Sequence, residues 1–289
     1  MSSRVCNSAL TIDEIELVIN NKLQTDGKIS QWTAEDISGG KGFMSIMAKV
    51  DLSWTEPVDS RLPRSVVCKI PTATKVKYLQ NKHAEMSSTI NNVLCQCHKC
   101  EVSLYDAFSE LANCPVNVPY VFGCKSLSSS QAVDGEQAAY IIMEDLSGRA
   151  ETFNFAFFRK IKQSQMEQVI SQLGRLHAWS LSNDVSKVAC PDWATMRPFM
   201  ETWLTNGYTD LQSYLNDNRD YFDDQLHSRC FELRATVDGY FEALTLNRKY
   251  AVSDVMCHGD VHPANVMFHR DPTGKLYPTG DLVAIVDWQ

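Results

Sequence analysis

A carboxylate and a carboxamide stand on one short segment near residue 260. His258, Asp260 and Asn265 form the pattern H-x-D-x-x-x-x-N, and Pro263 stiffens the turn between them. Transfer of a phosphoryl group needs a carboxylate that orients and deprotonates the acceptor hydroxyl. It also needs oxygen ligands for the Mg²⁺ ion that bridges nucleotide phosphates. Asp260 suits the first role and Asn265 the second, so the segment predicts a catalytic loop for this chemistry.

A second metal ligand is predicted where the chain returns to this loop. Residues 266–268 have the composition of a strand, residues 271–274 form an Asp-Pro-Thr-Gly turn, and residues 282–286 have the composition of the partner strand. Such a hairpin brings Asp287 beside Asn265, where its carboxylate can ligate the same ion. The alternative is a surface loop with scattered acidic residues.

A lysine inside an apolar strand could supply a positive charge for phosphates. Lys69 lies in the run 65–70, which is rich in β-branched residues. In a nucleotide site such a lysine contacts phosphates and needs an acid to hold it. Glu101 on the following helix is the best candidate, with Glu110 and Glu85 as weaker ones. The alternative is an edge-strand lysine that faces water.

A glycine cluster precedes this strand. Residues 39–45 read Gly-Gly-Lys-Gly-Phe-Met-Ser. Backbone N–H groups around Gly40, Gly42 and Ser45 could lie over phosphates, as glycine-rich loops do, and a plain hairpin turn is the alternative. The stretch lacks the Gly-Lys-Ser/Thr end of a Walker A motif. Ser45 stands where the dinucleotide-binding fingerprint has its last glycine.

Two other groupings of metal-ligating residues are present. Residues 95–100 contain three cysteines and a histidine, but they fall on a predicted helix. Residues i and i+2 of a helix point to opposite sides, so these side chains cannot converge on one zinc ion. His258 and His262, with Asp260 between them, could instead serve a metal-dependent hydrolase, although the other histidines are scattered along the chain.

The pattern of apolar residues predicts a sheet-rich first half and a helix-rich second half. Capping boxes at Thr11–Glu14 and Ser164–Glu167 start two helices. The predicted helices cover residues 11–23, 84–111, a segment from 164 onward, and most of 199–246. The predicted strands flank the glycine turn and cover residues 46–54, 65–70, 118–124 and 138–143. We therefore expect an α+β fold of two lobes: an N-terminal nucleotide-binding lobe, 1–144, with an antiparallel sheet and a helix, and a mostly helical C-terminal lobe, 145–289, with the catalytic loop.

Composition and charge limit the environment and the partners. The chain has 289 residues and a net charge of −8, so nucleic acid, whose phosphates attract basic surfaces, is not an expected partner. The sequence contains no run of about eighteen apolar residues that would predict a membrane span, and no secretory signal is visible. Ten irregularly spaced cysteines then predict reduced thiols and a cytoplasmic location.

These residues, in this order, resemble a family of small-molecule kinases. The order is the glycine turn, Lys69, Glu101, a strand into Met143–Leu146, the loop H-G-D-V-H-P-A-N and the ending I-V-D-W-Q. Over nearly its whole length the chain resembles the choline-kinase-like and ecdysteroid-kinase-like kinases, relatives of the aminoglycoside phosphotransferases. The stretch G-K-G-F-M-S with Trp54 is most similar to the nematode-type branch.

The resemblance implies a two-lobed fold like that of protein kinases, with ATP and Mg²⁺ as cofactors. It implies transfer of the γ-phosphate to a small molecule with a hydroxyl group, choline-like, sterol-like or another alcohol. It assigns these roles by position: catalytic base for Asp260; Mg²⁺ ligands for Asn265 and Asp287; contact with the α- and β-phosphates for Lys69, paired with Glu101; adenine binding for the backbone from Glu144 to Leu146; and bracing of the loop for His258.

One departure from the family pattern concerns the end of the chain. Family members continue past the D-W-Q motif with helices that complete the second lobe, whereas this sequence stops at Gln289. We therefore expect an incomplete C-terminal lobe, with Asp287 near a fraying end and exposed apolar faces on the helices from residue 165 onward. An active kinase and a catalytically impaired kinase-like protein that binds nucleotide or a partner are both open.

Overall fold

The computed structural model describes residues 3–38, 44–73, 86–127, 138–185, 188, 190–221, 224–225, 228–229, 237–244 and 249–288. The strands are β1 (Ile29–Asp36), β2 (Ser45–Trp54), β3 (Ser65–Pro71), β4 (Val121–Lys125), β5 (Tyr140–Glu144), β6 (Ala150–Thr152), β7 (Val266–His269) and β8 (Leu282–Ile285). The helices are α1 (Ile12–Leu23), α3 (Met86–Ser109), α4 (Gln163–Ser182), α5 (Trp193–Asp217) and α7 (Val237–Leu244), with 3-10 turns η1 (Val5–Asn7), η2 (Phe155–Lys160), η3 (Arg219–Tyr221) and η4 (Pro263–Asn265).

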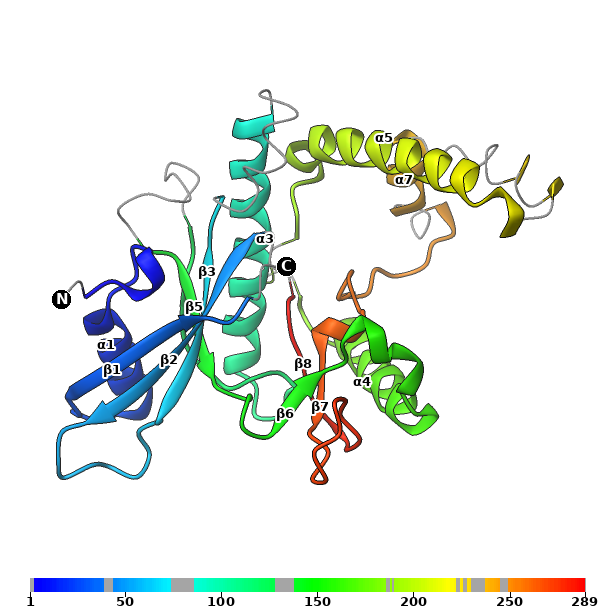
Figure 1. Ribbon diagram of the computed structural model, residues 1–289. Coiled ribbons are helices and arrows are strands. Elements are labelled where there is room, and N and C mark those ends of the chain that lie inside the picture. The colour runs from blue at the N-terminus through cyan, green and yellow to red at the C-terminus, as the bar shows by residue number, and fades with distance from the viewer. Residues whose placement is uncertain are drawn as a thin grey trace.

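The first half of the chain forms a five-stranded antiparallel sheet in the order β1-β2-β3-β5-β4 (Figure 1). β3 occupies the centre and is buried on both faces, which explains its continuous β-branched run. The α+β prediction is confirmed, and the arrangement is compatible with a two-lobed kinase-like fold.

The two faces of this sheet pack against different partners, because successive residues of a strand point to opposite sides. One face packs against α1, with Val66 and Cys68 of β3 in the same apolar cluster as Ile15 and Ile19. On the other face, Val67 joins a cluster that includes residues of α3, α4, β7 and β8. Residues of β3 with odd numbers, Lys69 among them, therefore face the second half of the chain.

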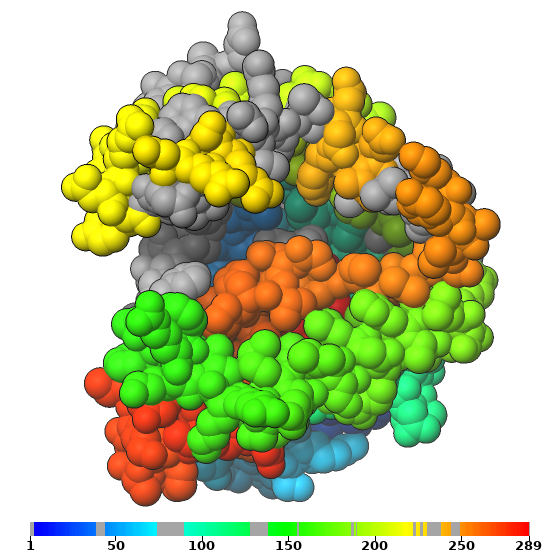
Figure 2. All heavy atoms as spheres, turned by 90° about the vertical axis from the view of Figure 1, so that its right-hand side faces the viewer, coloured from blue at the N-terminus to red at the C-terminus, as the bar shows by residue number. Residues whose placement is uncertain are grey.

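The second half contains a smaller antiparallel sheet, β6-β7-β8, with α4 beside it (Figure 1). The predicted hairpin of residues 266–268 and 282–286 is confirmed by the pairing of Val266 with Ile285. β6 was not predicted. α5 contacts α3 and lies apart from the small sheet. In Figure 2 the surface is hollowed between α5 (yellow) above and α4 (green) with the orange segment below.

Two helices in this half begin earlier than the predicted ranges. α4 begins at Gln163 rather than after Ser164, because the Gln165 side chain accepts a hydrogen bond from the Lys162 N–H at 3.0 Å. α5 begins at Trp193, six residues before the predicted start, because Asp192 caps it through the N–H of Ala194. At α1, by contrast, Thr11 accepts from the N–H of Glu14 as predicted.

The predicted apolar face of α4 is only partly buried. Val169 and Leu176 lie in the core, whereas Ile170 is 63% exposed, as are Met166 and Leu181 to a lesser extent. These are exposed apolar side chains of the kind expected from residue 165 onward. Among the helices that the structure describes, none is long and apolar enough to cross a bilayer.

Candidate active site

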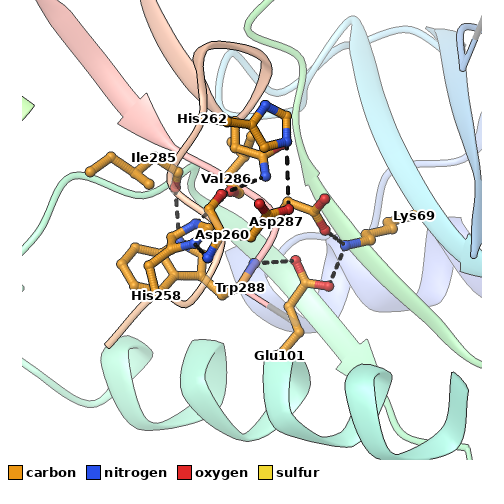
Figure 3. Close-up of polar contacts among 10 residues, drawn as sticks. Lys69, Glu101, His258, Asp260, His262, Ile285, Val286, Asp287 and Trp288 are labelled. Atoms are coloured by element: carbon orange, nitrogen blue, oxygen red, sulfur yellow. Dashed lines mark hydrogen bonds and ion pairs between the residues drawn. The ribbon is translucent and has the colours of Figure 1, made fainter. Parts of the chain in front are cut away.

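Three charged side chains from distant parts of the chain meet between the two sheets (Figure 3). Lys69 Nζ lies 2.6 Å from Glu101 Oε2 and 2.5 Å from Asp287 Oδ1. Lys69 comes from β3, Glu101 from α3, and Asp287 directly follows β8. The strand, the helix and the hairpin that the sequence indicated thus place their functional side chains in one cluster.

In this cluster, the opposite charges of Lys69 and its two carboxylate partners stabilise one another's ionised forms. Burial by itself would lower the pKa of Lys69, but the charges of Glu101 and Asp287 outweigh it and raise that pKa, so Lys69 stays protonated. Burial raises the pKa of Glu101, and the Lys69 charge opposes that rise. The Asp287 side chain remains 32% exposed, which makes it the member of the cluster that solvent and ligands can reach.

The loop of residues 258–265 is braced by His258. The N–H of Asp260 donates to His258 Nδ1 at 3.2 Å, so the ring proton lies on Nε2 and is donated to the Val286 carbonyl at 2.9 Å. Burial lowers the pKa of His258, which keeps the ring neutral. Its ring also lies 4.4 Å from that of Trp288, centroid to centroid. His258 therefore ties the loop to the strand that ends at Asp287.

Asp260 presents its carboxylate to solvent, with 69% of the side chain exposed. His262 Nδ1 accepts from the N–H of Ala264, which leaves the Nε2 proton of His262 directed at Asp260 Oδ2, 3.5 Å away. Gly259 has φ +86°, a conformation that costs glycine little, and the sharp turn separates His258 from Asp260. An exposed carboxylate on a braced loop is the geometry that a base needs to reach a bound hydroxyl group.

Asn265 and Asp287 are neighbours, as the predicted hairpin requires. The N–H of Val286 donates to the Asn265 carbonyl at 2.9 Å. The side-chain nitrogen of Asn265 donates to the Asp260 carbonyl at 3.0 Å, so Oδ1 is its atom for a cation. Asp287 has φ +69°, in the left-handed region that aspartate tolerates. A carboxylate and a carboxamide oxygen are hard donors of the kind that Mg²⁺ takes, so the residues fit this ion.

The other predicted binding positions are placed as follows. Ser45 is buried at the start of β2, on the same face as Lys69, because it lies two residues from Met47, which pairs with Lys69. Leu146 is buried against the small sheet, and its carbonyl accepts from two N–H groups of the following turn. The Glu144 side chain accepts from the Tyr120 N–H. The predicted positions Gly40 and Gly42 lie outside the described residues.

The competing metal sites gain no support from the geometry. Both ring nitrogens of His258 are engaged with the backbone, which removes it as a ligand for a metal-dependent hydrolase. His98 is buried and its Nε2 bonds to the Lys125 carbonyl. In the part of the chain that the structure describes, no group of three His, Cys, Asp or Glu side chains could hold a metal ion. A Mg²⁺ site made of one Asn, one Asp and a nucleotide phosphate does not need three such side chains.

A protein-family model matches residues 5–289, almost the whole chain; its description is "Uncharacterized oxidoreductase dhs-27". The chain belongs to this DUF1679 family. No curated protein matches the chain in sequence. The geometry above is therefore that of a DUF1679 member, and the nematode-type kinase branch suggested by the motifs agrees with it only loosely.

Two features of this DUF1679 site had no counterpart among the sequence predictions. The N–H of Trp288 donates to Glu101 Oε1 at 3.3 Å, so Glu101 holds both Lys69 and the chain after Asp287. Lys49 of β2 lies 3.2 Å from Asp145 Oδ2. The sequence carried a signal for the contact between Lys49 and Asp145. The alternation of side chains along β2 places Lys49 on the same face of the sheet as Lys69.

Proposed function

We propose that this protein is an ATP- and Mg²⁺-dependent phosphotransferase that moves the γ-phosphate to a hydroxyl group of a small molecule. The observation that carries the proposal is the meeting of Lys69, Glu101 and Asp287 beside a loop braced to present Asp260. Phosphoryl transfer requires this combination of cation, metal ligand and base more than it requires covalent chemistry from the protein.

Each residue then has a chemical role. Lys69, held by Glu101, binds phosphate oxygens, while Asp287 and Asn265 would hold Mg²⁺, which would neutralise phosphate charge when bound. Asp260 orients the acceptor hydroxyl and takes its proton. The hydroxyl oxygen forms a bond to the γ-phosphorus, and the bond from that phosphorus to the bridging oxygen breaks. A phosphate ester and ADP are the products.

The acceptor is a small alcohol, choline-like, sterol-like or of another kind. The segment that carries Asp260 belongs to the orange region below the hollow in Figure 2. Because Asp260 is largely exposed, an acceptor can reach its carboxylate.

The family description names an oxidoreductase, and the sheets favour phosphoryl transfer over an oxidoreductase that binds a dinucleotide. The doubly wound fold that binds dinucleotides is built on a parallel sheet. Every strand pair in the two described sheets is antiparallel.

The decisive experiment is phosphate transfer from radiolabelled Mg-ATP to a panel of alcohols that includes choline and sterols. Asp260→Asn keeps the size of the side chain and removes the base, so we expect a loss of transfer of about a hundredfold or more. Asp217→Asn, at an exposed position of α5, is the matched control and should transfer like the parent. If Asp260→Asn transfers as well as the parent, the proposed mechanism is wrong.

Nucleotide binding is measured separately by thermal unfolding. Mg-ATP at a hundredfold excess over its dissociation constant should stabilise the parent by roughly 2.7 kcal/mol. Stabilisation without transfer to any alcohol would favour a kinase-like protein that acts by binding. Absence of stabilisation would count against both.

A further inference from the structure

A second lysine lies on the same face of the large sheet as Lys69. In the β2–β3 pairing, Met47 is opposite Lys69 and Lys49 is opposite Val67. Directly opposed residues of an antiparallel pair share a face, and so do residues two apart on one strand. Lys49 and Lys69 therefore point to the same side, which is the side of the Asp287 cluster.

The ammonium group of Lys49 reaches across to the linker after β5. Lys49 Nζ lies 3.2 Å from Asp145 Oδ2 and 3.3 Å from Ser147 Oγ. The carboxylates of Asp51 and Glu35 also face it, the former at 3.9 Å. The side chain remains 25% exposed, so a ligand can still touch it.

The Asp145 carboxylate is held in place by protein donors. Ser65 Oγ donates to Oδ2 at 2.8 Å and the N–H of Ser147 donates to Oδ1 at 2.8 Å. With Lys49 added, Asp145 is a fixed support for the ammonium group rather than a ligand for another molecule. An ammonium group has three N–H donors, and Asp145 and Ser147 engage two of them.

The position of Lys49 along the sheet matters as much as its charge. The Val67 rung is about 7 Å from the Lys69 rung, because strands rise by about 3.4 Å per residue. It also adjoins the linker, since Val66 pairs with Glu144. A nucleotide with phosphates at Lys69 and its base at residues 144–146 would lie near the Lys49 ammonium group, which is at Asp145.

We propose that Lys49 is a nucleoside-binding residue whose third N–H donates to an acceptor atom of the purine base. Asp145 and Ser147 hold the ammonium group in place for this contact. The proposal rests on the proposed function, because it concerns the base end of the same nucleotide site. The two lysines then bind different parts of one ligand, since Lys69 contacts the phosphates and Lys49 contacts the nucleoside.

The test compares Mg-ATP with Mg-tripolyphosphate, which has the phosphates without the nucleoside, by calorimetric titration. Lys49→Met should weaken Mg-ATP binding about tenfold, the effect of losing one charged hydrogen bond. It should leave tripolyphosphate binding within about twofold of the parent, whereas Lys69→Met should weaken both ligands. Lys28→Met removes an exposed lysine that pairs with Glu16 and is the matched control, with no expected change for either ligand.

Lys49→Arg keeps the charge and the pair with Asp145, so it should restore Mg-ATP binding to within about threefold of the parent. Unchanged Mg-ATP affinity in Lys49→Met would overturn the proposal. Equal weakening of the binding of both ligands would also overturn it. Lys49 would then affect binding only by stabilising the sheet, without a contact to the nucleoside. A parent that binds neither ligand overturns both proposals, whereas selective weakening of Mg-ATP without transfer to any alcohol overturns only the proposed function.

Discussion

The Lys69 ammonium group faces two carboxylates, so the cluster has one excess negative charge when all three groups are ionised. Glu101 is buried away from solvent, whereas Asp287 is partly exposed. A divalent cation at Asp287 would balance the excess and would free Lys69 for another anion. At the scale of single residues, this imbalance is the physical reason for proposing a metal–phosphate ligand at the site.

Replacement of Lys69 should expose the same imbalance as a loss of stability. Lys69→Met leaves Glu101 buried without its cation, so we expect a loss of roughly 3–5 kcal/mol at pH 8. Burial raises the pKa of Glu101 above its unfolded value, so the native state of the variant binds the extra proton. Its stability therefore falls as pH rises, and the loss should be smaller at pH 5. Denaturant titrations of parent and variant at both pH values measure this; equal losses at pH 5 and pH 8 would contradict it.

Among the elements, α4 is bound to its surroundings by glutamines. Gln165 Nε2 donates to the Gly280 carbonyl, Gln168 Oε1 accepts from the Leu282 N–H, and Gln172 Oε1 accepts from the Asn117 N–H. These side chains lie at i, i+3 and i+7, on one face of the helix. Gln165 and Gln168 hold the chain that enters β8, and Gln172 holds the segment before β4, so the inner face of α4 is partly polar.

Gln165 bonds to two backbone groups at once. Gln165→Leu leaves the Lys162 N–H and the Gly280 carbonyl without this partner, so we expect a loss of about 1–3 kcal/mol in the free energy of unfolding. Gln163→Leu, two residues away, removes only an exposed bond to Glu167 and should change stability by about 0.5 kcal/mol or less. Similar losses in the two variants would show that Gln165 does not anchor the hairpin.

At the scale of the whole molecule, one apolar cluster joins the two predicted lobes. It contains Val67 and Ile141 of the large sheet together with Leu176, Ile285 and Trp288 of the second half. The predicted boundary at residue 144 therefore divides the elements of the large sheet from those of the second half in the sequence. The apolar core is shared by both sides of this boundary.

A shared core predicts unfolding of the described part as one cooperative unit. Trp288 is 4% exposed and lies against His258 and Phe108, so Trp288→Ala should cost about 3–5 kcal/mol. Trp203→Ala, at a position 65% exposed on α5, should cost about 0.5 kcal/mol or less. Calorimetry should show one transition in the parent; two resolved transitions would mean that the lobes are independent.

Much of the site was predictable because its parts are local in the chain. The H-x-D-x-x-x-x-N spacing and the hairpin determine that Asp260, Asn265 and Asp287 lie near one another, since the turn and strands involve neighbouring residues. The pairing of Lys69 with Glu101, rather than with the exposed Glu110, also followed from strand and helix patterns. The polar inner face of α4 was missed because its glutamines bond to backbone groups more than fifty residues away.

The sequence by itself determined the order of the main strands and helices, though not β6, and the short loop that presents Asp260. These depend on periodicity, capping and turn chemistry, which act over a few residues. Only the tertiary structure decided that Lys69 bonds directly to Asp287, that Trp288 binds Glu101, and that Lys49 is held at the linker. The reason is physical: those contacts join residues far apart in the chain, and the packing of two sheets and α3 sets which side chains meet.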